Sequence, residues 1–194
     1  MTHFQIGRHV RPCDGEAVAG DAVVIKPCAG GVFFSLIDVL GHGRDAADVA
    51  LLAIRFLKQK ASPDVVEVLC GLNEHLKGSR GAMAVIAFAH TADGAISFTG
   101  IGNVMVRRFS DREEFFPWPD GIVGIRFRTP RLCQVQMGAS DVLLVHSDGV
   151  SENLSAAVTS KLLSHPVEAI ARRIVLDHGR LYDDAACIAA RYEP

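Results

Sequence analysis

The chain has 194 residues, of which 49% are hydrophobic and 22% charged, so it can bury a sizeable core and has the balance of a folded globular protein. Its formal net charge of −2 and scattered basic residues argue against a nucleic-acid-binding or membrane-binding surface. The N-terminal segment has no apolar stretch of signal-peptide length, and the five cysteines are too widely spaced for a zinc knuckle. We therefore expect one domain over residues 1–194, located in the cytoplasm with reduced thiols.

Apolar segments rich in Val, Ile and Phe and bounded by turn residues predict strands. In chain order these are Ala22–Ile25, Gly31–Val39, Ala82–Ala89, Ala95–Ile101, Val104–Phe109, Leu132–Met137, Val142–His146 and Ala185–Ala190. Apolar residues at helical spacing predict helices at Arg44–Lys60, Pro63–Lys77 and Val167–His178. Pro63 fits the first turn of its helix after a Ser62 cap, and Gly78 and Gly179 fit helix ends.

This order of elements is not the strict alternation of a doubly wound parallel sheet. Two strands precede two helices, a long series of strands follows, and one helix precedes the last strand. The order favours an α+β fold with two antiparallel sheets flanked by helices.

Several predicted strands begin or end at an aspartate. Asp38 and Asp148 each follow an apolar strand, Asp21 precedes one, and Asp183 and Asp184 precede the last. Each alone is explained as a turn or cap residue. A converging set of buried carboxylates without matching Lys or Arg, however, is what a hard cation such as Mg²⁺ or Mn²⁺ requires.

Four ordered segments together resemble the metal-dependent protein phosphatase (PPM, PP2C-like) superfamily in its bacterial SpoIIE-like branch. They are Gly20-Asp21, Asp38-Val-Leu-Gly-His-Gly43, His146-Ser-Asp-Gly-Val-Ser-Glu152 and Asp183-Asp-Ala-Ala186. Thr99–Arg107 and Asp120–Ile125 are also similar to that branch. The third segment is the most specific, and the resemblance covers nearly the whole chain.

The resemblance implies an αββα sandwich and a protein serine/threonine phosphatase that uses two Mn²⁺ or Mg²⁺ ions. It implies that Asp38 bridges both ions and that the Val39 carbonyl faces one of them. Asp148 and Asp183 would complete the first metal site, and Asp21 would reach the second. The resemblance leaves the role of Asp184 open, and it assigns neither Arg8 nor Arg11 to the phosphate.

His42 follows the bridging aspartate closely and is the candidate proton donor, because an imidazole exchanges protons near neutral pH. A structural histidine that bonds a loop carbonyl is the alternative for His42. His146, within a predicted strand, fits a core or supporting role.

The length and the lack of a regulatory domain are similar to the free-standing phosphatase type of the stressosome. That type implies a phosphoserine or phosphothreonine on a STAS-domain scaffold protein as substrate. The alternatives are a catalytically inactive binding module of the same fold and a phosphatase for an anti-sigma-factor antagonist. A haloacid-dehalogenase phosphatase is disfavoured because Asp38-Val39-Leu40 lacks a second acid, and the element order disfavours a receiver domain.

Overall fold

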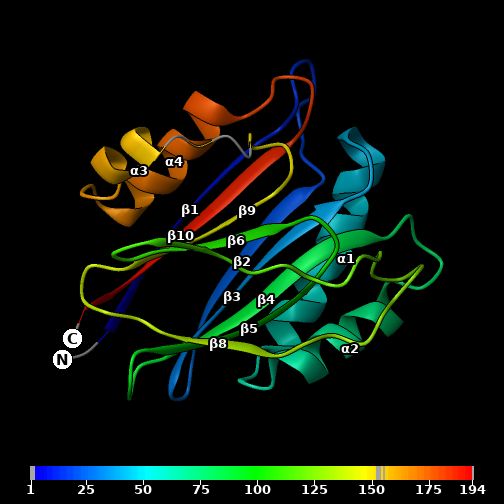
Figure 1. Ribbon diagram of the computed structural model, residues 1–194. Helices are drawn as coiled ribbons and strands as arrows, with labels where there is room; N and C mark the ends of the chain where they lie inside the picture. The colour runs from blue at the N-terminus through cyan, green and yellow to red at the C-terminus, as the bar shows by residue number, and fades with distance from the viewer. Residues whose placement is uncertain (1–2, 152–153, 155, 194) are drawn as a thin grey trace.

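The computed structural model describes residues 3–151, 154 and 156–193 (Figure 1). Its strands are β1 His3–Arg11, β2 Asp21–Cys28, β3 Gly31–Val39, β4 Ala82–His90, β5 Ala95–Ile101, β6 Met105–Phe109, β7 Glu113–Phe115, β8 Cys133–Gln136, β9 Val142–His146 and β10 Ala185–Glu193. Its helices are α1 Gly43–Lys60, α2 Val65–His75, α3 Ala156–Leu162 and α4 Val167–His178.

The strands form two antiparallel sheets. One has the order β1-β10-β9-β6-β7 and the other the order β2-β3-β4-β5-β8. The two sheets face each other, with α1 and α2 on the outside of one and α3 and α4 on the outside of the other (Figure 1). The αββα sandwich expected from the sequence is thus confirmed.

Side chains alternate along β3 between the two cores that it contacts. Phe34 and Leu36 are fully buried between the sheets, whereas Phe33 and Ile37 are buried against α1 and α2. Asp38 lies two residues beyond Leu36 and so falls on the side of the strand that faces the other sheet. The hydrophobic pattern of β3 therefore sets the direction of this carboxylate.

The first strand was not predicted from the sequence. β1 pairs with β10 along its full length and carries Phe4, Ile6 and Val10 toward the core between the sheets. Arg8 interrupts this alternation, which hides the strand in the sequence. The Arg8 guanidinium donates to the Val23 carbonyl at 3.0 Å and so joins the edges of the two sheets.

The predicted start of the second helix was wrong. Its N-cap is Asp64, whose carboxylate accepts the Glu67 amide at 3.0 Å, and the helix begins at Val65 rather than Pro63. Ser62 instead accepts the Asp64 amide through its hydroxyl at 3.1 Å. The prediction also omitted β7 and α3, which are short. Gly179 is the C-cap of α4, as expected.

Within the described ranges, none of the helices is both long enough and apolar enough to cross a lipid bilayer.

Candidate active site

The predicted aspartates meet at one end of the sandwich, where the ends of two strand pairs face each other. β2 begins and β3 ends there in one sheet, while β9 ends and β10 begins there in the other. β10 lies against both β2 and β3, which brings the two pairs together. Each pair contributes carboxylates to the gap between the sheets, and the structure thereby assembles Asp21, Asp38, Asp148, Asp183 and Asp184.

Asp21 and Asp38 are direct partners across the β2–β3 ladder, and both are buried. Asp21 accepts the Ser147 hydroxyl at 2.6 Å, which links it to the other sheet. The Oδ2 atom of Asp38 is buried with no hydrogen-bond partner in the described part of the chain. An ionised oxygen in that position costs free energy unless a cation is bound beside it.

Burial and mutual repulsion change the protonation of these two carboxyls. Burial, followed by the charge of Asp21, raises the pKa of Asp38 to about 9. Burial also raises the pKa of Asp21 to about 8, against the lowering effect of the Ser147 hydrogen bond. With both pKa values raised, Asp21 and Asp38 hold protons near neutral pH when no cation is bound.

Asp148 and Asp183 come from the second sheet and are half-buried. Burial and the charge of Asp148 raise the pKa of Asp183. The turn after Asp148 approaches the start of β10 so closely that a Cβ on Gly149 would lie 1.8 Å from the Asp184 carbonyl oxygen. Glycine at this position therefore keeps Asp148 beside Asp183.

Asp184, whose role the sequence left open, anchors backbone. Its Oδ1 accepts the Cys13 amide at 2.7 Å, and its Oδ2 accepts the Gly20 amide at 2.6 Å. The side chain is buried and ties the loop between β1 and β2 to the start of β10. Both Asp184 oxygens are engaged by amides, so Asp184 positions Asp21. It differs from Asp183, whose Oδ1 accepts the Asp184 amide.

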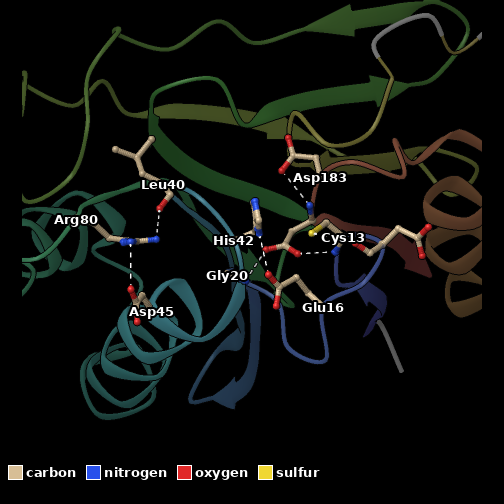
Figure 2. Close-up of polar contacts among 10 residues, drawn as sticks. Cys13, Glu16, Gly20, Leu40, His42, Asp45, Arg80 and Asp183 are labelled. Carbon is tan, nitrogen blue, oxygen red and sulfur yellow. Dashed lines mark hydrogen bonds and ion pairs between the residues drawn. The ribbon is translucent and has the colours of Figure 1, made fainter.

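His42 is the N-cap residue of α1 and lies beside this cluster on the exposed rim. Its Nδ1 is 3.1 Å from the Glu16 carboxylate, so its bond goes to a side chain and not to a loop carbonyl (Figure 2). Val39 is the last residue of β3 and is buried next to Asp38. His146 is fully buried in β9, and burial lowers its pKa to about 4, so it stays neutral.

Further polar residues support the site, and three of them, Asn103, Arg180 and Arg80, were not singled out from the sequence. Asn103 donates to the Asp148 carboxylate at 2.6 Å, and Arg180 donates to the Asp148 carbonyl at 3.0 Å. Arg11 donates through Nη2 to the Arg180 carbonyl at 2.6 Å and so helps to hold this loop. Arg80 donates to the Leu40 carbonyl at 3.0 Å, beside the segment that leads to His42 (Figure 2).

The donor set fits a hard divalent cation. The four predicted side-chain ligands supply only carboxylate oxygens, which Mg²⁺ and Mn²⁺ prefer. In the part of the chain that the structure describes, none of these carboxylates forms an ion pair with a lysine or an arginine. The buried Asp38 oxygen without a partner is the clearest sign that the site is built around a cation.

Comparison with known proteins identifies the family. The sequence model of the Stage II sporulation protein E (SpoIIE) family matches residues 29–193. The phosphoserine phosphatase RsbX of Bacillus subtilis (strain 168) is 23% identical over 142 residues, which cover 71% of this chain and 70% of RsbX.

Solved structures share the fold over almost the full chain. One comes from work on the bacterial stressosome as a modular system adapted to control secondary messenger signalling. It is 28% identical to this chain with a TM-score of 0.88, and the match covers 97% of this chain and 99% of that structure's chain. RsbX in complex with magnesium is 20% identical to this chain with a TM-score of 0.82, and the match covers 98% of this chain and 96% of the RsbX chain. The chain therefore belongs to the SpoIIE family, within the PP2C-like metal-dependent protein serine/threonine phosphatases.

Proposed function

We propose that this protein removes phosphate from phosphoserine or phosphothreonine on a folded signalling protein, with two Mg²⁺ or Mn²⁺ ions held by Asp21, Asp38, Asp148 and Asp183. The observation that carries the proposal is the meeting of these carboxylates from both sheets around a buried Asp38 oxygen without a partner. The Val39 carbonyl, next to Asp38 at the end of β3, is proposed as a further oxygen ligand.

The proposed substrate is a STAS-domain component of a stressosome. Similarity to the phosphoserine phosphatase RsbX and to a chain studied as part of the bacterial stressosome supports this choice. The rim of the site is open, since His42 and Arg80 are both exposed. An open rim suits a phosphate that stands on a folded surface, recognised through a small and transient interface.

Divalent cations at such a site neutralise a phosphate dianion and make a bound water more acidic. The aspartates of this chain hold the cations, and burial between the sheets keeps bulk water away from the Asp21 and Asp38 carboxylates. Ser147 and Asp184 hold the segment that carries Asp21, through bonds to the Asp21 carboxylate and the Gly20 amide. Asn103 holds the Asp148 carboxylate.

His42 is proposed to give a proton to the departing serine or threonine oxygen. The Glu16 carboxylate beside Nδ1 favours the tautomer with a proton on that atom. In the imidazolium, Nε2 also carries a proton and can donate it. Glu16 therefore has the role of a residue that positions His42.

Phosphate release tests the function directly. With Mn²⁺, the protein should hydrolyse a generic aryl phosphate, and chelator should abolish that activity. It should also hydrolyse an intact phosphorylated STAS-domain scaffold with higher kcat/KM than a peptide carrying the same phosphoresidue, because a folded surface adds docking contacts.

Other results of this assay would contradict parts of the proposal. No metal-dependent release from any phosphoester would indicate a catalytically inactive binding module. Equal kcat/KM for scaffold and peptide, or a preference for a phosphorylated anti-sigma-factor antagonist, would contradict the scaffold as substrate.

Substitutions at the neighbouring Asp183 and Asp184 distinguish a proposed metal ligand, Asp183, from a residue that binds backbone amides, Asp184. Asp184→Asn should lower the free energy of unfolding by about 1–3 kcal/mol in chelator, because an amide can accept only one of the two backbone N–H groups now bound. Asp183→Asn should leave that stability nearly unchanged but weaken Mn²⁺ binding and turnover. Urea denaturation and Mn²⁺ titration measure both effects, and identical behaviour of the two variants would be inconsistent with these assignments.

The raised pKa values of Asp21 and Asp38 predict how stability depends on pH. Without metal, the folded state keeps protons that the unfolded chain releases above about pH 4. The retained protons stabilise the folded state. This stabilisation is complete below about pH 4 and is lost as pH rises through the folded-state pKa values of about 8 for Asp21 and about 9 for Asp38.

In chelator, the Tm of the wild type should therefore fall more steeply between about pH 6 and about pH 9 than that of Asp38→Asn, which carries no titrating group at this position. Mg²⁺ should raise the wild-type Tm more at about pH 9 than at about pH 6, because more of the carboxylates are then free of protons. Parallel pH profiles for wild type and variant in chelator would show that Asp38 does not titrate in this range.

A further inference from the structure

A second group of metal-ligating side chains lies beside the aspartates without belonging to them. Cys13, Glu16 and His42 each place one ligand atom within 4.8 Å of the other two (Figure 2). Cys13 and Glu16 come from the loop between β1 and β2, and His42 comes from the residue that precedes α1. In the assignment above, only His42 and Glu16 have a role, and the cysteine is unexplained.

The loop holds Cys13 and Glu16 in fixed positions. The Glu16 amide donates to the Cys13 carbonyl at 3.1 Å and closes a tight turn, in which Gly15 has φ +86°. The Asp14 amide donates to the Leu181 carbonyl at 2.7 Å, and the Cys13 amide donates to Asp184 at 2.7 Å. The turn is therefore tied to the same loop that carries Asp183.

The segment around His42 is shaped to approach this turn. Gly41 and Gly43, on either side of His42, both have positive φ. A Cβ on Gly43 would lie 2.8 Å from the Glu16 Oε1 atom, so the carboxylate packs directly against the glycine backbone. This close approach brings Glu16 Oε1 to 3.1 Å from His42 Nδ1.

The three donors differ in chemistry from the aspartate cluster. A thiol, an imidazole and a carboxylate form a set that Zn²⁺ binds well, whereas Mg²⁺ prefers oxygen ligands alone. The Cys13 side chain is buried, and its sulfur has a weak contact with the Asp14 carbonyl at 3.9 Å. Asp183 and Asp184 add negative charge around the sulfur, which favours a cation there.

We propose that Cys13, Glu16 and His42 form a separate site for one thiophilic divalent cation, Zn²⁺, and that its occupancy inhibits the phosphatase. Three protein ligands leave a fourth position for water, as in open zinc sites. The Cys13 thiol gives its proton to solvent when the sulfur binds. The inhibitory part rests on the proposed function of His42, whereas the binding part does not.

Inhibition follows from the atom that binds the cation. An imidazole bound through Nδ1 cannot carry a second proton, so Nε2 of His42 can no longer act as the proton donor of an imidazolium. The cation also takes the Glu16 carboxylate away from its role beside His42. Occupied, the site would slow the release of serine and threonine oxygens, which are poor leaving groups.

Cobalt is a probe that separates the two metal sites by their ligands. Co²⁺ added to reduced protein in excess Mg²⁺ should produce a thiolate-to-cobalt charge-transfer band in the near ultraviolet that saturates at one equivalent. Cys13→Ser should abolish the band, and Glu16→Gln, on the partly exposed side of the site, should weaken Co²⁺ binding about 10-fold or more.

Two control variants should keep the band. Cys28→Ser removes a half-buried thiol that contacts the Lys26 carbonyl at 3.6 Å, at the end of β2 opposite Asp21. Asp38→Asn alters the aspartate cluster and leaves the three proposed ligands in place. Absence of the band in the wild type, or its persistence in Cys13→Ser, would overturn the site.

The inhibitory part is tested by Zn²⁺ titration of activity in excess Mg²⁺, with each variant normalised to its own rate without Zn²⁺. The concentration for half-inhibition should rise about 10-fold or more in Cys13→Ser relative to wild type and Cys28→Ser. Equal sensitivity would overturn the inhibition. A Cys13-dependent cobalt band in a protein without phosphatase activity would instead refute the proposed function and leave the cation site standing.

Discussion

The repulsion among carboxylates at one end of the sandwich is the constraint on which the site depends. Folding brings together Asp21, Asp38, Asp148 and Asp183, although like charges at short range and burial both oppose ionisation. The apolar core between the sheets must supply the free energy that holds these groups together when no cation is present. Divalent cations turn this unfavourable arrangement into a favourable one, so metal binding and the stability of this end of the fold are linked.

Much of this arrangement follows from local sequence patterns. The alternating side chains of β3 direct Asp38 toward the other sheet, and the Val142–His146 strand leads directly to Asp148. The layers of the fold could therefore be predicted, as could the positions of these aspartates at strand ends. The ligand assignments, by contrast, came from resemblance and stay predictions.

What the sequence could not predict depends on contacts between distant segments. β1 was missed because Arg8 interrupts its apolar pattern and its partner, β10, lies at the other end of the chain. Asp184 could not be distinguished from Asp183, because its role arises from amides at positions 13 and 20. The group formed by Cys13, Glu16 and His42 was likewise invisible, since no short spacing connects residue 42 to the β1–β2 loop.

The central claim is that carboxylates from both sheets hold divalent cations, with Asp38 at their centre. Calorimetric titration of Mn²⁺ into wild type, Asp38→Asn and the control Asp111→Asn, an exposed aspartate between β6 and β7, tests it most directly. We predict that Asp38→Asn weakens Mn²⁺ binding about 100-fold or more, while Asp111→Asn binds as the wild type does. Unchanged stoichiometry and affinity in Asp38→Asn would contradict the account.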